Sequence, residues 1–71
     1  MRLHYYPETD SLYIELTEYP STDSSVIAPG VVLDFDESAR LVGIDIDHAS
    51  AVVDLSTLEA TALPIRALAV A

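Results

Sequence analysis

The sequence predicts a small α+β domain. An antiparallel β-sheet of four to five strands, built from two hairpins, is followed by one or two short helical turns near the C-terminus. Two observations lead to this fold. Two pairs of short segments alternate apolar and polar residues, with a turn between the members of each pair. Capping residues replace this alternation after residue 47. The length of 71 residues suits a single domain, 1–71, with a β core at 3–50 and an apolar segment at 51–71.

The first predicted hairpin joins residues 3–6 to residues 11–16 through the turn Pro7–Asp10. Placing Tyr6 opposite Ser11 gathers the apolar side chains on one face, whereas a slip of one residue would mix the two faces. The apolar face is then expected to hold Leu3, Tyr5, Leu12, Ile14 and Leu16. The other face is expected to place Arg2 near Glu15 and His4 near Tyr13.

The second predicted hairpin joins residues 31–36 to residues 41–47 through a turn at 37–40. A polar loop at 18–25 and a short edge strand at 26–28, ending at Pro29, precede it. With Asp36 opposite Leu41, one face carries Val31, Leu33, Phe35, Val42, Ile44 and Ile46. The opposite face carries Asp34, Asp36, Asp45 and Asp47. A sheet with one apolar side must have that side covered.

The C-terminal third is expected to provide part of this cover. Ser50 is a plausible N-cap for a short turn through Val53, and Ser56–Glu59 has the form of a capping box. A short helix there would lay its apolar residues on the sheet, namely Val52, Val53, Leu55 and Leu58. Residues 60–71 carry one charge, Arg66, and such an apolar segment is expected to pack in an interface.

The charge balance excludes several classes of partner. Twelve acidic residues against three arginines give a net charge of −9, which argues against nucleic acid and anionic membranes. No segment approaches the roughly 20 apolar residues of a membrane span, and the N-terminus lacks a signal-peptide pattern, so a cytoplasmic location is expected. Because the chain has no cysteine, association or a metal is the expected source of extra stability.

The chain contains, in this order, Tyr5, Asp10, Leu12–Ile14, Gly30–Val31, Asp34–Glu37, Gly43–Ile46 and Ala49–Ser50. Over residues 3–50 this series resembles the domain of unknown function family 2283, a group of short, mostly bacterial proteins. The relatives often have Asp-Gly or Gly-Asn in the second hairpin turn, where this chain has Ser38–Ala39. The resemblance implies a small β-rich fold without an established activity. Some members are thought to be encoded beside small toxins, which implies an antitoxin-like binding role.

The acidic face is the sharpest candidate for chemistry. Carboxylate oxygens suit hard cations such as Mg²⁺ or Ca²⁺, so the candidate metal ligands are Asp34, Asp36, Asp45, Asp47 and the neighbouring His48. Diagonal neighbours in a sheet lie about 7–8 Å apart, so these side chains would have to converge to share an ion. The alternatives are a solvated face and a face covered by the C-terminal segment or by a partner.

No catalytic residue and no organic cofactor are predicted. Asp47, His48 and Ser50 could supply a nucleophilic triad, but adjacent residues alternate in direction along a strand, and the surrounding sequence has no nucleophile elbow. Gly30 and Gly43 are isolated, so no phosphate-binding glycine loop is expected. The sequence therefore gives little support to an enzyme.

Three aromatic residues are candidates for partner binding. Tyr6, Tyr13 and His4 are expected on one exposed patch, with ordinary cross-strand packing as the alternative, whereas Tyr5 is expected in the core. Three functions follow as hypotheses. The first is a non-catalytic dimeric interaction module that captures a basic protein, its homodimer held by the C-terminal segment or by sheet edges. The others are a metal-binding protein or metal-dependent enzyme, and a purely structural homo-oligomer.

Overall fold

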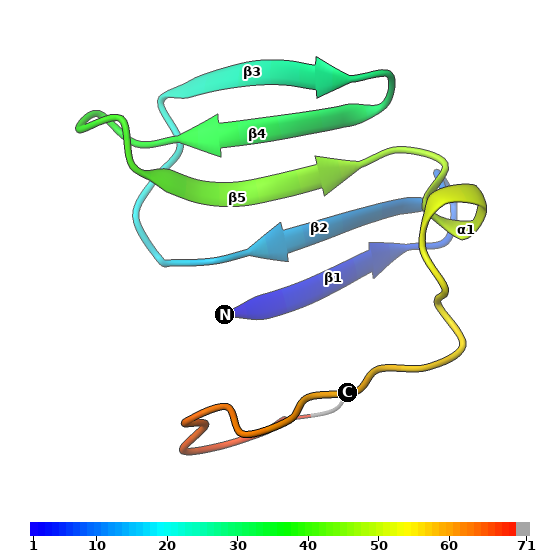
Figure 1. The fold of residues 1–71 in the computed structure, drawn as a ribbon. Helices are drawn as coiled ribbons and strands as arrows, with labels where there is room; N and C mark the ends of the chain where they lie inside the picture. Colours follow the sequence, from blue (N-terminus) through cyan, green and yellow to red (C-terminus); the bar gives the residue numbers. More distant parts are fainter. Residues whose placement is uncertain (70–71) are drawn as a thin grey trace.

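The structure, a computed structural model, describes residues 1–69 and contains a five-stranded antiparallel sheet and one short helix (Figure 1). The elements are β1 (Arg2–Tyr6), β2 (Ser11–Glu15), β3 (Asp23–Ala28), β4 (Val31–Phe35), β5 (Leu41–Ile46) and α1 (Ala49–Val52). The strand order is β1-β2-β5-β4-β3, so β1 and β3 are the two edges. The predicted antiparallel sheet and the short helix near the C-terminus are confirmed, with five strands and one helix among the described residues.

The register between β1 and β2 agrees with the prediction. Tyr6 lies opposite Ser11, and Leu3 lies opposite Ile14, so the apolar residues of both strands share one face. Asp10 ends the connecting turn with φ of 52°, a left-handed conformation that Asp tolerates better than most residues. The alternation of the sequence therefore selected the correct pairing of these strands.

The segment between β2 and β3 crosses the ends of two other strands. Leu16 N donates to Val42 O (2.8 Å) on β5, and Thr22 N donates to Phe35 O (2.8 Å) on β4. This crossing brings β3 to the far edge, from which β4 and β5 lead back to β2, as in a Greek key. The guanidinium of Arg40 lies 4.3 Å from the ring centre of Tyr19 and so ties the crossing segment to the β4–β5 turn.

The predicted loop at 18–25 is too long, because β3 begins at Asp23 rather than at residue 26. Asp23 and Ser24 pair with Phe35 and Asp34 of β4, and Ser24 Oγ donates to Asp34 Oδ1 (2.7 Å). Every residue of β3 is exposed. Polar residues fit an exposed edge strand, since its neighbour supplies the backbone hydrogen bonds and burial of side chains is not required.

The register between β4 and β5 agrees with the prediction only up to Asp34, which lies opposite Gly43. Beyond it a β-bulge places Phe35, rather than Asp36, opposite Leu41, so the predicted position of Asp36 is wrong. Asp36 instead belongs to the turn, where its carboxylate accepts hydrogen bonds from the backbone N–H groups of Ser38 (2.9 Å) and Arg40 (3.0 Å). The turn ends at Ala39, which has a left-handed conformation (φ of 61°). A turn followed by a left-handed residue is a common three-residue hairpin loop.

The two faces of the sheet differ in chemistry. Residues that lie opposite one another across the ladder share a face, so the pairings place nine apolar residues on one face, namely Leu3, Tyr5, Leu12, Ile14, Val31, Leu33, Phe35, Ile44 and Ile46. At the β3 edge of this face the pairings add Asp23, Ser25 and Ala28. The acidic face consists of Arg2, His4, Tyr6, Ser11, Tyr13, Glu15, Ser24, Val26, Val32, Asp34 and Asp45.

Residues 1–69 place no second layer over the apolar face. Among residues 1–69 only three apolar residues are buried, Leu12, Val42 and Ala49. Tyr5 is 44% exposed and Leu3 is 47% exposed, so the prediction that Tyr5 is a core residue is wrong. The pairing of Tyr5 is as predicted, but a side chain on a single sheet reaches full burial only when another element packs on it.

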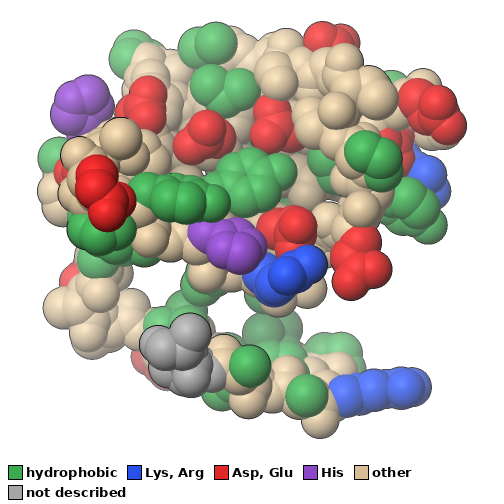
Figure 2. All heavy atoms as spheres, turned by 180° about the vertical axis from the view of Figure 1, so that it is seen from behind, with side chains coloured by type: hydrophobic (Ala, Val, Ile, Leu, Met, Phe, Trp, Pro, Cys, Tyr) green, Lys and Arg blue, Asp and Glu red, His purple; other side chains and the backbone are tan. Residues whose placement is uncertain are grey.

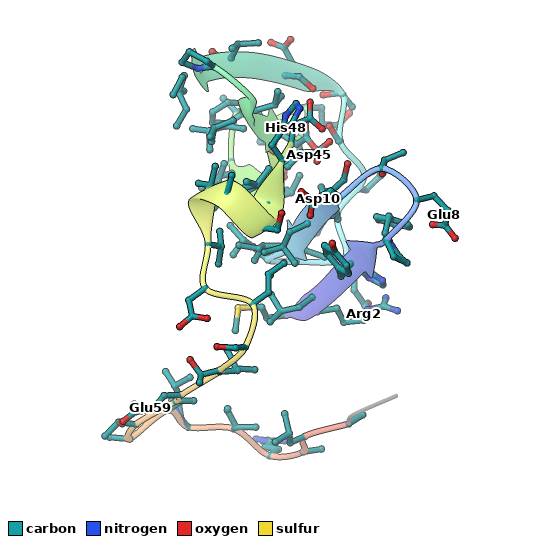
Figure 3. All side chains as sticks on the ribbon, turned by 90° about the vertical axis from the view of Figure 1, so that its right-hand side faces the viewer. Arg2, Glu8, Asp10, Asp45, His48 and Glu59 are labelled. Atoms are coloured by element: carbon teal, nitrogen blue, oxygen red, sulfur yellow. The ribbon has the colours of Figure 1, made fainter. Side chains whose placement is uncertain are left out.

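The described part of the C-terminal segment, residues 51–69, does not provide that cover. No helix forms at 56–59, and Leu58 is 75% exposed. The helix α1 is instead preceded by His48 as its N-cap, so the prediction of Ser50 as the N-cap is wrong. Beyond α1 the chain runs away from the sheet, past the β1 edge, and covers neither face (Figures 1 and 3). An isolated short helix is unstable without packing, which explains why the capping box has no helix. Residues 70 and 71 of the predicted apolar segment lie outside the described residues.

The replacement Ala39→Gly is expected to stabilise the protein by about 0.5–1 kcal/mol. Ala39 has φ of 61°, a left-handed conformation that costs a residue with a Cβ about 1–2 kcal/mol. Glycine avoids this cost, but its greater backbone freedom in the unfolded state cancels a part of the gain. Urea unfolding monitored by circular dichroism measures the change. Ala28→Gly on the exposed β3 edge is the control and should destabilise. Equal losses in both variants would contradict the role assigned to the turn.

Candidate functional site

The acidic face is the surface on which the sequence placed most of its candidate residues. Seen from behind, this side of the molecule shows carboxylates above and beside an apolar patch, with a histidine and an arginine at its lower border (Figure 2). In the ladder, one row across the sheet runs through His4, Tyr13, Asp45 and Val32, and the next runs through Arg2, Glu15, Gly43 and Asp34. The sheet therefore holds aromatic and acidic side chains next to each other.

The hydroxyl end of the Tyr13 side chain lies over Gly43 on this face. A Cβ atom added at Gly43 would stand 2.6 Å from Cζ of Tyr13, so the ring occupies the space that any other side chain would fill. Burial on the sheet raises the pKa of the Tyr13 hydroxyl, and the neighbouring Asp34 carboxylate raises it further through its charge and hydrogen bonding. The absence of a side chain at Gly43 thus leaves room for the Tyr13 ring next to the Asp34 carboxylate.

Three carboxylates of this side repel one another. The pKa of Asp45 is raised, first by burial and then by the negative charges of Asp47 and Asp34. Asp34 accepts a hydrogen bond from Ser24, and Ser11 Oγ donates to Asp47 Oδ1 (3.3 Å). The two ion pairs within residues 1–69 involve other carboxylates: Glu15 pairs with Arg2 (2.7 Å) on the same face, and Asp36 pairs with Arg40 (2.9 Å) in the β4–β5 turn. The charge of the three carboxylates is therefore not neutralised by an ion pair in this part of the chain.

The five predicted metal ligands do not gather at one point. Asp36 is 5% exposed and binds Arg40 in the turn, at the end of the sheet. His48 lies beyond β5 in a left-handed conformation, next to Ala49, whose backbone N–H donates to Asp10 O. In the described part of the chain, no group of three acidic or histidine side chains has the spacing to hold a metal ion. A metal site therefore stays a prediction of the sequence.

The candidate aromatic residues lie close together on the acidic face. The rings of His4 and Tyr6 are stacked with centres 6.5 Å apart, and His4 lies opposite Tyr13 across the ladder. Tyr6 is 49% exposed, whereas His4 and Tyr13 are partly buried. The structure thus brings together the three residues predicted to bind a partner.

A cluster that the sequence reasoning missed lies at the end of the first turn. Asp10 Oδ1 accepts hydrogen bonds from Tyr5 Oη (2.7 Å) and Ser50 N (3.1 Å), and Asp10 Oδ2 accepts one from Ser50 Oγ (2.7 Å). Ala49 N donates to Asp10 O (2.8 Å). These hydrogen bonds, those from Ser50 first, lower the pKa of Asp10. The order Tyr5, Asp10, Ala49, Ser50 was visible in the sequence, but nothing in it indicated that the four residues meet.

The contacts of this cluster also bear on the nucleophilic triad that the sequence could supply from Asp47, His48 and Ser50. The Ser50 hydroxyl donates to Asp10, and Asp47 accepts a hydrogen bond from Ser11; within residues 1–69 no side-chain hydrogen bond joins either residue to His48. Ser50 therefore acts as a link between α1 and the β1–β2 turn. We call the contacts among Tyr5, Asp10, Ala49 and Ser50 the Asp10 clamp.

The fold and the two faces define a single-layer antiparallel β-sheet protein with an acidic, aromatic surface. The family model described as "Protein of unknown function (DUF2283)" matches residues 2–50, more than half of the chain, and the chain belongs to this family. No curated protein and no solved structure matched the chain. None of the helices in residues 1–69 is long and apolar enough to cross a membrane.

The variant Asp45→Asn is expected to be more stable than the wild type at pH 7. The folded-state pKa of Asp45 lies above 3.8, so the ionised form is disfavoured in the folded protein and stability falls as the pH rises through that pKa. The gain should disappear at a pH well below 3.8. Thermal unfolding at pH 7 and pH 3 measures both values.

Asp36→Asn is the control with the opposite sign. The pKa of Asp36 is lowered, first by the hydrogen bond from the Arg40 backbone, so its stabilising contribution is present above pH 3.8 and is lost as the pH falls through the lowered pKa. This variant should therefore be less stable than the wild type at pH 7. Destabilisation by Asp45→Asn at pH 7 would contradict the electrostatic description of the acidic face.

Proposed function

We propose that this protein is a non-catalytic interaction module that acts as a homodimer and binds a basic protein through its acidic face. The observation that carries the proposal is the opposite chemistry of the two sheet faces, one apolar and uncovered, the other acidic and aromatic. An uncovered apolar face favours association, because apolar surface gains free energy when it leaves water. An acidic face favours encounters with positively charged partners.

The acidic face offers an arginine side chain two kinds of contact at once. The ring of Tyr13 can receive a guanidinium on its exposed side, and Asp34 and Asp45 stand next to it. The molecule contains one example of this combination, since Arg40 lies over Tyr19 and pairs with Asp36. The pKa of Asp45 is raised first by burial and then by the charges of Asp47 and Asp34, and a cation from a partner would relieve this repulsion.

An antitoxin-like role, with a small basic toxin as the partner, is one form of this function and follows from the family resemblance. The cytoplasmic location predicted from the sequence suits this role. The geometry gives less support to a divalent-metal function, since Asp36 is engaged with Arg40 and His48 lies near Asp10. A purely structural homo-oligomer remains the competing hypothesis, and it leaves the acidic face without a use.

A defined probe tests the proposed surface. A fluorescein-labelled peptide of nine arginines should bind the full-length protein, and its affinity should fall as salt is added, because the net charge of the chain is −9. The variant Asp34→Asn/Asp45→Asn should bind the peptide about fivefold more weakly or worse, since two exposed ion pairs are lost. Fluorescence anisotropy measures the dissociation constants.

The matched control is Glu37→Gln/Glu59→Gln, which removes the same two charges from the β4–β5 turn and from the C-terminal segment (Figure 3 labels Glu59). Its affinity for the peptide should stay close to that of the wild type. Equal losses in the two double variants would mean that net charge alone attracts the peptide. That result would overturn the acidic face as the binding surface and leave the structural homo-oligomer as the better hypothesis.

A further inference from the structure

The largest unexplained feature of the molecule is its apolar face. Two adjacent rows of side chains cross the sheet there, one through Leu3, Ile14, Ile44 and Leu33, the other through Tyr5, Leu12, Ile46 and Val31. Of these eight residues only Leu12 is buried. The helix α1 has four residues and lies at one end of the sheet, so it leaves the centre of the face open (Figure 1).

The face is large enough to form a stable interface. Neighbouring strands lie about 4.8 Å apart and a five-residue strand is about 17 Å long, so five strands present a surface of roughly 20 by 17 Å. When two such surfaces pack together, they bury on the order of 1,000 Å² of accessible surface, because side chains add area to the flat outline. This area is at the lower limit for a specific protein interface.

The apolar chemistry of this face favours a second copy of the chain as the partner that covers it. The eight residues of the two rows carry no charge, so a strongly basic partner gains nothing there and is drawn to the acidic face instead. The described part of the C-terminal segment, which runs past the β1 edge, does not reach the face (Figures 1 and 3). A second copy brings the same two uncharged rows, and Asp23, the charged residue that the pairings place on this face, lies on the edge strand β3.

We propose that two copies of the chain pack their apolar faces together as a two-layer β-sandwich, related by a two-fold axis that passes near Ile44. This inference rests on the homodimer of the proposed function and names the surface that forms it. Packed sheets lie about 10 Å apart, and both acidic faces then point outward on opposite sides of the sandwich. Their separation exceeds the Debye length of about 8 Å at physiological ionic strength, so the net charge of −9 on each copy opposes the pairing only weakly.

Sedimentation equilibrium of the full-length protein tests the interface. The wild type should be a dimer, and the variant Leu33→Thr/Ile44→Thr should dimerise about 100-fold more weakly or worse, because each dimer loses apolar contacts at four positions. Threonine keeps the β-branched shape that strands favour. Val26→Thr/Val32→Thr is the matched control, since these two residues pair with each other on the acidic face, and it should remain dimeric.

A second measurement keeps the test valid if the threonine variant does not fold. The chain has no cysteine, so Ile44→Cys introduces a single thiol near the proposed two-fold axis, and Val32→Cys places one on the opposite face. Mild oxidation should link the copies of the first variant and leave the second largely unlinked. Efficient linking through position 32 with none through position 44 would overturn the proposed interface.

The possible failures are distinguishable. A monomeric wild type at millimolar concentration would overturn both this inference and the homodimer of the proposed function. A dimer that survives Leu33→Thr/Ile44→Thr but is lost in Leu63→Ser/Ile65→Ser/Leu68→Ser, a triple change in the C-terminal segment, would overturn the face-to-face packing alone. In that case the homodimer of the proposed function would stand, with the C-terminal segment as its interface.

Discussion

A single β-sheet exposes two faces to its surroundings. The free energy gained by covering the apolar face is expected to drive the association of this chain. In larger folds a helix layer or a second sheet supplies the cover. Here α1 has four residues and the described part of the following segment turns away, so Leu33 and Ile44 stay only partly buried. A chain of 71 residues has little apolar area to spare. Folding and association are therefore expected to be linked, with the stability dependent on protein concentration.

The two ends of the sheet are held by polar contacts rather than by a core. At one end the Asp10 clamp joins the first turn to α1, and at the other Arg40 binds Asp36 and covers Tyr19. The family match spans residues 2–50 and so ends at Ser50, the residue that closes the clamp on Asp10. The family match thus covers the clamped sheet of this chain, and the C-terminal segment lies beyond the matched residues.

The sequence predicted the sheet well because alternation has a period of two, and one slip would have moved Leu3 and Ile14 to different faces. It failed at Asp36, since a bulge breaks this period without a signal in the residue pattern. Of the candidate residues, strand parity placed His4, Tyr6, Tyr13, Asp34 and Asp45 on one face, as predicted. The contact of Asp10 with Ser50 was not found, since it depends on where the chain turns after β5. The helix predicted from the capping box at 56–59 was also wrong, because no sheet surface packs against that segment to stabilise a helix.

The most direct test is an isotope-filtered NOE experiment on a mixture of ¹³C-labelled and unlabelled protein, which detects only contacts between copies. The account predicts contacts from the methyl groups of Ile44 and Leu33 on one copy to apolar-face residues of the other. Contacts confined to the C-terminal segment or to the exposed edge strand β3, with none to Ile44, would contradict the central claim that the uncovered sheet face is what the protein uses to associate.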